Sequence, residues 1–348
     1  MSEANAPQGL TVKEYKTDVH PVWCPGCGDF GVLTCIYRML ATKQISPDNL
    51  VVVAGIGCSG RLSGYVKSYG FHTVHGRVLP VVTGVKTANP NLVVSGVGGD
   101  GDAYSIGAGH IPHAARRNID VCYIVMDNEV YGLTKGQGSA TAPQDLATGT
   151  TPYGQLDEPL NPIAMAIAYD IGFVARGFSA KPKELTDLIV QGVEHKGFAL
   201  IEVLSPCTTF HDTYKPISQR VRFVGPEHDP TDRMKAFQLA LERETIPLGV
   251  IYKRERSAFH ERAEKIQTES IAKRGKASVE VLDEAGQPLA GFSGDEVVPV
   301  TKLDELRWQP QWKQHTDLSA LRNRVVRLKF RLSNAKLYSF QIGGEQAK

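Results

Sequence analysis

The sequence lacks any apolar run that approaches the roughly 18 uncharged residues of a membrane span. Its first residues, MSEANAPQGL, also lack the basic and apolar character of a secretion signal. Neither sign of charge is in excess, because 39 Lys and Arg against 37 Asp and Glu give a formal net charge of +2. Such a balance gives no electrostatic case for binding nucleic acid or a membrane. We therefore expect a cytoplasmic protein that binds neither.

Cysteine is scarce too, since 348 residues contain only six, at positions 24, 27, 35, 58, 122 and 207. These are too few and too widely spaced for a disulfide scaffold, and in a reducing cytoplasm cysteines that cluster indicate metal or redox chemistry. Two of them lie close together in the stretch HPVWCPGCGDFG, which begins at residue 20. This pair fits a disulfide switch, half of a zinc site or two corners of an iron–sulfur cluster.

Apolar runs rich in β-branched residues alternate with segments of helical periodicity. The runs predict buried strands at residues 49–57, 91–101, 120–128, 173–177 and 197–205. The periodic segments between them predict helices at 29–44, 103–117, 163–171 and 180–195. This alternation predicts an α/β fold with a mostly parallel sheet and helices on both faces.

The character of the chain changes after about residue 226. One more helix is predicted at residues 229–242, an exposed helix of alternating charge at 253–274 and a hairpin at 277–301. In LRNRVVRLKFR, residues 321–331, helical spacing places Leu321, Val325 and Leu328 on one face with five basic residues around them. That face is either solvated or contacts a subunit or an acidic partner. We predict a main domain at 1–255 and an extension of unknown role at 256–348.

The segment GGDGD, at residues 98–102, follows the second predicted strand, and the third ends at Asn128. Ligands of open parallel sheets bind outside the carboxyl ends of the strands. Glycines let backbone N–H groups approach a phosphate, while Asp100 and Asn128 offer the oxygen atoms that Mg²⁺ prefers. The segment predicts a cradle for a magnesium diphosphate, with an ordinary Gly-rich turn as the alternative.

Gly-Asp-Gly followed by Asn 28 residues after the Asp resembles the diphosphate motif of thiamine-diphosphate enzymes. The resemblance implies that Mg²⁺ is held by Asp100, Asn128 and the carbonyl group of Val130.

The cysteine pair gains context from two single cysteines. A thioredoxin-type dithiol needs a buried strand before it, which LTVKEYKTDVHPV does not provide, and four-thiolate zinc sites usually contain two close pairs. Cys58 and Cys207 each follow an apolar strand and can reach the same sheet edge as Cys24 and Cys27. Four thiolates from three loops suit a 4Fe–4S cluster. We expect the other two cysteines, Cys35 and Cys122, to be small buried hydrophobic residues.

Five stretches in this order resemble the thiamine-binding β subunit of the 2-oxoacid:ferredoxin oxidoreductases: WCPGCGDFG, GIGCSGR, HGR, GGDGD…DNEVYGLTKGQ and LSPC. The resemblance covers about residues 10–255. It implies cluster ligation by Cys24, Cys27, Cys58 and Cys207. It implies cofactor binding by Cys58, Ser59, His75, Gly99, Asp100, Gly101, Asp102, Asn128, Val130, Tyr131, Gly132 and Leu133. It implies catalytic roles for Arg61, His75 and Lys135, with Arg77 near the diphosphate or the substrate carboxylate.

The resemblance also implies a reaction, in which a 2-oxoacid is decarboxylated with thiamine diphosphate, coenzyme A takes the acyl group, and electrons pass through the cluster to ferredoxin. Lys135 stands where many pyruvate-preferring relatives have glycine and could pair with the second carboxylate of 2-oxoglutarate, so we expect that substrate. Alternatives are pyruvate or another 2-oxoacid, a non-redox thiamine-dependent decarboxylase or synthase, and a zinc-binding structural or nucleic-acid protein.

One component of a thiamine enzyme is not found in the sequence. By the same resemblance, the glutamate that activates thiamine lies on a separate pyrimidine-binding domain. The roughly 80 residues beyond the matched region lack a βαβαβ pattern. We therefore expect an obligate α subunit that supplies this glutamate, with ferredoxin as a second, transient partner.

Overall fold

The computed structural model describes residues 9–273, 275–301, 308–337 and 339–342 of the chain. Two compact units, residues 1–261 and 262–348, make up the chain, and the predicted boundary after residue 255 lies six residues before this division. Residues 1–8, which contribute to the expectation that there is no secretion signal, lie outside the described residues. No helix in the described ranges is long and apolar enough to cross a membrane.

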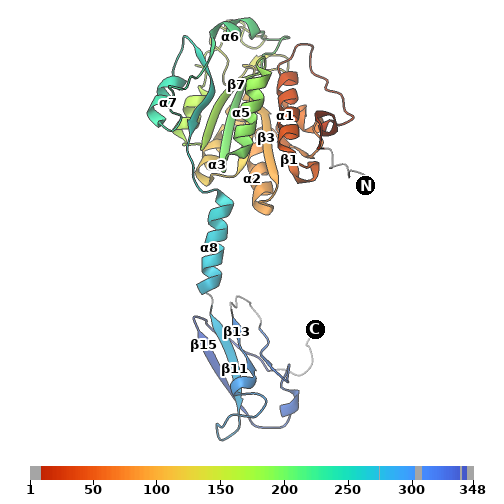
Figure 1. Ribbon diagram of the computed structural model, residues 1–348, viewed down its shortest axis with the longest axis vertical. Helices are drawn as coiled ribbons and strands as arrows, with labels where there is room; N and C mark the ends of the chain where they lie inside the picture. Colours follow the sequence, from red (N-terminus) through yellow and green to blue (C-terminus); the bar gives the residue numbers. More distant parts are fainter. Residues whose placement is uncertain (1–8, 274, 302–307, 338, 343–348) are drawn as a thin grey trace, which may run out of the picture. The chain divides into compact units, whose positions relative to one another are not determined.

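The first unit is built on an eight-stranded sheet of order β2-β1-β3-β4-β8-β7-β10-β9 (Figure 1). Neighbouring strands are parallel except for β10 and β7, which confirms the predicted mostly parallel α/β fold. The strands are β1 Leu50–Ala54, β2 Tyr69–His72, β3 Val93–Gly99, β4 Val121–Asp127, β7 Phe173–Phe178, β8 Phe198–Leu204, β9 Val221–Phe223 and β10 Ile246–Lys253.

Helices cover both faces of this sheet because successive side chains of a strand point to opposite sides. In β1, Leu50, Val52 and Ala54 pack with α1 (Asp29–Lys43) and α5 (Pro182–Glu194), which lie side by side in Figure 1. Val51 and Val53 belong to the core on the other face. The helices of that core are α2 Val78–Ala88, α3 Ile111–Arg117, α4 Pro162–Ala168 and α7 Arg233–Ala240.

Strand β10 was not predicted from the sequence. Its run IPLGVIYK contains Pro247 and Gly249, two residues that normally argue against a strand interior. Gly249 has a φ of 130°, and the pairing with β7 is irregular between Val250 and Tyr252, so the strand accommodates both residues through local distortion. Helix α6 (Tyr214–Arg220) precedes β9.

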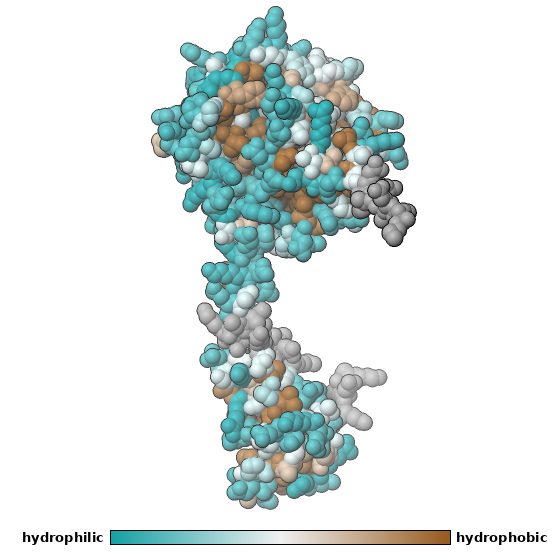
Figure 2. Space-filling model, in the orientation of Figure 1, coloured by the Kyte–Doolittle hydropathy of each residue, from teal (hydrophilic) through white to brown (hydrophobic). Residues whose placement is uncertain are grey.

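Helix α8 (Phe259–Lys273) matches the exposed helix predicted at residues 253–274, whose last residue lies outside the described ones. Its surface is mostly hydrophilic in Figure 2. The second unit contains a three-stranded antiparallel sheet of β13 (Val300–Thr301), β11 (Lys276–Leu282) and β15 (Arg327–Ser333). A two-stranded sheet of β12 (Val297–Val298) and β14 (Gln311–Trp312) accompanies it. The hairpin predicted for 277–301 is found only in part: β11 and β13 pair antiparallel through two residue pairs, and β12, which pairs with β14, lies between them in the sequence.

The prediction of a helical face at residues 321–331 is wrong. Residues 327–331 of this stretch belong to strand β15, which pairs with β11 from Arg327 to Ser333, and none of the stretch is α-helix. Leu328 and Phe330 are half-buried, whereas Arg327, Lys329 and Arg331 are exposed. The apolar residues therefore repeat every two positions, as in a strand with one covered face, and the partner strand lies some 50 residues earlier in the sequence.

Candidate active site

The predicted site residues lie on loops at one edge of the sheet. Strands β1 and β3 are neighbours, and β1 pairs with β2 on its other side while β3 pairs with β4 on its other side. Such a switch point opens a crevice outside the carboxyl ends of the strands, where open parallel sheets bind ligands. The segments after β1, β3, β4 and β8 contain Cys58, Asp100, Asn128 and Cys207.

Asp100 is buried at the carboxyl end of β3, with 1% of its surface exposed. Its Oδ2 accepts hydrogen bonds from the hydroxyl groups of Ser139 and Thr141. The Thr141 hydroxyl also lies 2.8 Å from Oδ1 of Asp127, the last residue of β4. Burial raises the pKa of Asp100 to about 6, and burial followed by the charge of Asp100 raises the pKa of Asp127. Two buried carboxyl groups around one hydroxyl fit a site that a divalent cation would stabilise.

Asn128 begins a tight turn directly after β4. Its Oδ1 accepts a hydrogen bond of 3.1 Å from the backbone N–H of Val130, and Glu129 between them has a φ of 65°. The turn packs on the loop of Asp100, because a Cβ atom on Gly101 would lie 2.3 Å from the ring of Tyr131. The structure therefore brings together the three predicted magnesium ligands, whose role stays a prediction.

A hairpin follows this turn, formed by β5 (Val130–Tyr131) and β6 (Gln137–Gly138). Its tip contains Gly132, Leu133 and Lys135, of which Leu133 and Lys135 are exposed. Lys135 has a φ of 77°, and Gly136 next to it packs against the ring of Phe210. The backbone of the predicted substrate-binding lysine is thus fixed within the hairpin, while its side chain is exposed.

Asp102 lies in a π-helical turn, η4 (Gly101–Ile106), where the sequence predicts the start of a regular helix. A short 3₁₀ segment, η5 (Ala108–His110), separates this turn from α3. Asp102 Oδ1 accepts hydrogen bonds from the backbone N–H groups of Ile56 and Gly76 and contacts Nδ1 of His75 at 2.8 Å. The carboxylate therefore connects the loop after β1 with the loop that contains His75.

The remaining predicted residues of this edge differ in exposure. Ser59 is buried, and its Oγ lies 3.4 Å from where a Cβ atom of Gly99 would be. Arg61 and Arg77 are exposed, and the charge of Arg77 contributes to a lowered pKa of His110, after the larger effect of burial. Both arginines are therefore accessible to solvent.

Three loops bring the four predicted cluster cysteines together. Thr208 Oγ1 donates a hydrogen bond of 2.9 Å to the Pro25 carbonyl group, which ties the Cys207 loop to the Cys24–Cys27 turn. The Trp23 indole donates one of 2.7 Å to the Cys58 carbonyl group, which ties this turn to the loop after β1. A Cβ atom on Gly132 would lie 3.4 Å from Cys58 Sγ and 4.0 Å from Cys207 Sγ.

The four thiols also influence one another electrostatically. Burial, then the charge of Asp29, raises the pKa of Cys58 to about 11, with smaller contributions from Cys207 and Cys24. Burial and Asp29 likewise raise the pKa of Cys27, and Cys207 and Cys58 contribute to that rise. Across the described ranges, no three His, Cys, Asp or Glu side chains are grouped closely enough to hold one metal ion. In a 4Fe–4S cluster each thiolate binds a different iron, so a wider group of four free thiols fits it.

The other two cysteines are buried away from this group, as predicted. Cys35 lies in α1 with its Sγ 3.3 Å from the Pro182 carbonyl oxygen, and Cys122 lies inside β4. Both belong to the hydrophobic core beneath the sheet edge.

Several residues of the site were missed from the sequence. Ser139 and Thr141 hold Asp100, and the His211 imidazole contacts the Glu129 carboxylate at 2.8 Å. Ser205 donates a hydrogen bond to the buried Asp29 next to the cysteine turn. Their roles depend on contacts between distant loops, and the only local signal is the cluster of small hydroxyl residues in GSAT after the hairpin.

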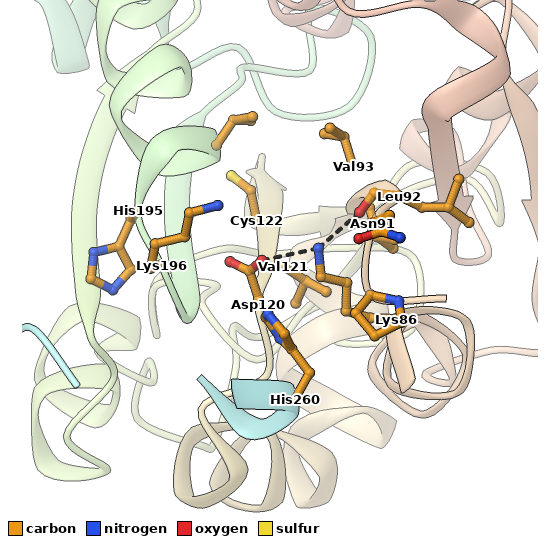
Figure 3. A pocket seen from close by; sticks show the side chains of 13 residues that line it. Lys86, Asn91, Leu92, Val93, Asp120, Val121, Cys122, His195, Lys196 and His260 are labelled. Carbon is orange, nitrogen blue, oxygen red and sulfur yellow. Dashed lines mark hydrogen bonds and ion pairs between the residues drawn. The ribbon is translucent and has the colours of Figure 1, made fainter. Parts of the chain in front are cut away.

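A separate cavity of about 310 Å³ lies at the opposite edge of the sheet, where β3, β4 and β8 begin (Figure 3). Lys86 there forms an ion pair with Asp120 at 2.9 Å and donates a hydrogen bond to the Leu92 carbonyl group. None of the predicted site residues lines this cavity.

Two family models match the chain. The C-terminal TPP-binding domain of thiamine pyrophosphate enzymes matches residues 55–203. The C-terminal part of the pyruvate ferredoxin oxidoreductase β subunit matches residues 207–268. The matches contain Cys58, Asp100, Asn128 and Cys207 but not the Cys24–Cys27 turn.

Similar proteins cover more than half of the chain. Subunit β of the 2-oxoacid:ferredoxin oxidoreductase 2 of Aeropyrum pernix is 43% identical over 268 residues, which are 73% of this chain and 87% of that protein. The 2-oxoglutarate oxidoreductase subunit KorB of Mycobacterium tuberculosis is 42% identical over 200 residues, 58% of this chain and 54% of that protein.

A solved structure is similar as well. The 2-oxoglutarate:ferredoxin oxidoreductase from Magnetococcus marinus, with 2-oxoglutarate, coenzyme A and succinyl-CoA bound, aligns with a TM-score of 0.74 and 41% identity. The alignment covers 75% of this chain and 90% of that one. The predicted resemblance is confirmed: the chain belongs to the β subunits of the 2-oxoacid:ferredoxin oxidoreductases and contains their thiamine pyrophosphate-binding domain.

Proposed function

We propose that this β subunit binds magnesium, thiamine diphosphate and a 4Fe–4S cluster and converts 2-oxoglutarate and coenzyme A to succinyl-CoA and CO₂. The reaction releases two electrons and a proton, and the electrons leave through the cluster to ferredoxin. When bound, thiamine diphosphate supplies the carbanion that adds to the 2-oxo carbon and the electron sink that lets CO₂ leave. The chain itself supplies binding, orientation and an exit for electrons.

The observation that carries the proposal is the position of Gly132. This residue lies four positions after Asn128, on the hairpin that the magnesium-site turn opens, and a Cβ atom on it would touch Cys58 and Cys207. The four-thiol group and the carboxylate–amide group are therefore joined by one short turn. A diphosphate site alone needs no thiols, whereas a redox enzyme needs its electron acceptor close to the reacting carbon.

The cation site follows from burial and charge. Asp100 and Asn128 are 1% and 7% exposed, so their oxygens are removed from water and held for one ligand. Mg²⁺ takes such oxygens, with the Val130 carbonyl group as the third, and bridges them to a diphosphate. Ser139 and Thr141 hold the Asp100 carboxylate in place through Oδ2. The exposed Arg61 and Arg77 would then attract the diphosphate or the substrate carboxylate.

The preference for 2-oxoglutarate is supported by Lys135 and by two relatives. Lys135 is exposed at the tip of the hairpin, and its ammonium group can pair with a second carboxylate that pyruvate lacks. The relatives from Mycobacterium tuberculosis and Magnetococcus marinus are both 2-oxoglutarate enzymes.

A β subunit implies partner subunits, and we infer that one of them is an α subunit with the glutamate that activates thiamine. In the first unit, the residues around the eight-stranded sheet are accounted for by the diphosphate domain and the cysteine loops. The second unit is a small antiparallel structure in its described part, unlike a thiamine-type domain. The pyrimidine half of the site is therefore expected from another polypeptide.

The test is to produce this chain with its partner subunit under nitrogen, to measure iron, sulfide and thiamine, and to assay ferredoxin reduction with coenzyme A. We expect about four irons per chain, a brown colour bleached by air, and faster turnover on 2-oxoglutarate than on pyruvate. Zinc without iron, or decarboxylation without ferredoxin reduction, would refute the proposal. Faster turnover on pyruvate would refute the substrate assignment alone.

A further inference from the structure

We propose that Asp102 is a positioning residue that acts through His75, fixing which nitrogen of the imidazole faces the substrate. The inference rests on the proposed function, because it concerns the 2-oxoacid site at the carboxyl edge of β1 and β3. It assigns to Asp102 a task different from contact with the cofactor, which the sequence predicted.

The Asp102 carboxylate is buried, and several contacts fix the position of one of its oxygens. Its side chain has no exposed surface, and three groups converge on Oδ1: the N–H of Ile56 at 2.9 Å, the N–H of Gly76 at 2.8 Å and Nδ1 of His75 at 2.8 Å. Burying a carboxylate costs several kcal/mol, which donors of this kind must offset. Three donors on one oxygen orient the carboxylate toward the His75 loop.

Space for the carboxylate is made by glycines on the two strands that flank the crevice. A Cβ atom on Gly55, just after β1, would lie 2.0 Å from Asp102 Oδ2, and one on Gly98 in β3 would lie 3.2 Å from it. Oδ2 itself has no hydrogen-bond partner in the described part of the chain. The fold therefore leaves a slot at the switch point that the Asp102 carboxylate fills.

His75 is held on two sides and open on the third. Nδ1 contacts Asp102, and Gly76 beside it has a φ of 72° and lies so close to Ile106 and Gly107 that a Cβ atom there would clash. The ring meets that of Tyr131 edge-on, with centroids 6.2 Å apart, and its side chain is 35% exposed. An ionised carboxylate only accepts hydrogen bonds, so the proposal places the ring proton on Nδ1, facing Asp102, and leaves Nε2 for a ligand.

This arrangement connects the dyad to the rest of the site. Tyr131 directly follows Val130, whose carbonyl group is a predicted magnesium ligand, and its ring packs on Gly101 beside Asp100. His75 thus stands next to the turn that would hold the diphosphate. A histidine fixed in this way can hydrogen-bond to, or exchange a proton with, the 2-oxo group or its carboxylate.

A purely structural role for Asp102 is the competing explanation, because the same oxygen ties Ile56 to Gly76. The two explanations differ in how substitutions combine. If Asp102 acts through His75, its loss should cost little once His75 is gone, whereas independent structural damage should multiply with the loss of His75.

The experiment compares Asp102→Asn, His75→Gln and the double variant in the complex with its partner subunit. We expect each single variant to lower kcat about 10- to 100-fold with less than about 3-fold change in KM for the 2-oxoacid, and the double variant to lose no more than the worse single one. Losses that multiply would overturn the proposal. The control is Asp120→Asn, which removes a carboxylate of 11% side-chain exposure at the opposite sheet edge (Figure 3) and is expected to change stability without this kinetic pattern.

A second measurement does not depend on turnover or on the folding of Asp102→Asn. Long-range ¹H–¹⁵N NMR of the wild-type complex labelled in its histidine rings, assigned with His75→Gln, reports which nitrogen carries the proton. We expect His75 to carry it on Nδ1 at all pH values where the ring is neutral. The Nε2–H tautomer would overturn the proposal even if the enzyme oxidises 2-oxoacids. Conversely, the Nδ1–H tautomer in a complex without 2-oxoacid activity would uphold the dyad and refute only the proposed reaction.

Discussion

Replacement of Asp100 by Asn should stabilise the cofactor-free chain and at the same time abolish its binding of magnesium and thiamine diphosphate. Asp100 is 1% exposed, and burial raises its pKa from 3.8 to about 6. A raised carboxyl pKa means that the folded state holds the charged form at a cost. Asp100 would therefore serve to bind the cation, although it destabilises the protein when the cation is absent.

The magnitude follows from the shift of the pKa. A rise of roughly two units corresponds to about 3 kcal/mol of stability, at 1.36 kcal/mol per unit. Well below the unfolded pKa of 3.8 the carboxyl group is protonated in both states and costs nothing, and the cost grows as the pH rises through 3.8 to the folded value near 6. Asn avoids this cost but turns an N–H toward the backbone N–H of Gly101, which costs about 1 kcal/mol. The net gain is about 1–2 kcal/mol at pH 7.5, or about 2–8 °C in Tm.

The assay is thermal unfolding of the chain freed of magnesium and thiamine diphosphate, at pH 4 and pH 7.5, with Asp48→Asn as a control for loss of an exposed carboxylate. With both ligands at 100 times Kd, the wild type should gain about 2.7 kcal/mol and Asp100→Asn nothing. The reasoning is refuted if Asp100→Asn lowers the stability at pH 7.5 by more than at pH 4, or if the ligands stabilise it as much as the wild type.

Three further predictions concern the cluster, the substrate and the partner. Cys207→Ser should lower the iron content and the rate of ferredoxin reduction at least about 10-fold, because the serine hydroxyl is a poor substitute for a thiolate. Cys122→Ser, in the core of β4, should leave both unchanged. Full iron content in Cys207→Ser would contradict the assignment of Cys207 as a cluster ligand. Lys135→Gly should raise KM for 2-oxoglutarate about 10-fold more than KM for pyruvate, because one charge-assisted contact to the second carboxylate is lost. Equal changes in both KM values would show that Lys135 does not select 2-oxoglutarate. Val74 lies beside His75 and is 77% exposed, so Val74→Asp should weaken binding of the partner subunit at least about 10-fold in a pull-down titration. Ile266→Asp, at a residue 65% exposed on α8, should leave this binding unchanged. Equal effects of the two variants would show that the site edge is not the interface.

The position of Cys58 and Cys207 at one sheet edge was predictable because it depends on topology alone. Cys58 and Cys207 each come after a buried apolar run, and all strands of a parallel sheet end at the same edge. The same rule places Asp100 and Asn128 there. No detail of side-chain packing was needed to predict that these residues meet.

Contacts between loops were not predictable in this way. Ser139 lies 39 residues from Asp100, and nothing in its local sequence distinguishes it from a loop serine. Asp102 was predicted as a cofactor contact because it follows Gly-Asp-Gly, yet its bonds to Ile56 and Gly76 depend on how two other loops fold. Strand β15 was misread for the related reason that its partner β11 decides its periodicity.

The hairpin at residues 130–138 would allow one short segment to serve both proposed cofactors. It begins with the turn from Asn128 to Val130, where the predicted magnesium ligands lie, and it reaches the cysteine group only two residues later, at Gly132. Ladder hydrogen bonds between β5 and β6 restrain this distance, so the proposed cluster would be held at a set distance from the proposed diphosphate site. Electron transfer needs a constant separation of donor and acceptor. A two-stranded hairpin with Gly132 against the thiols meets that need with nine residues of chain.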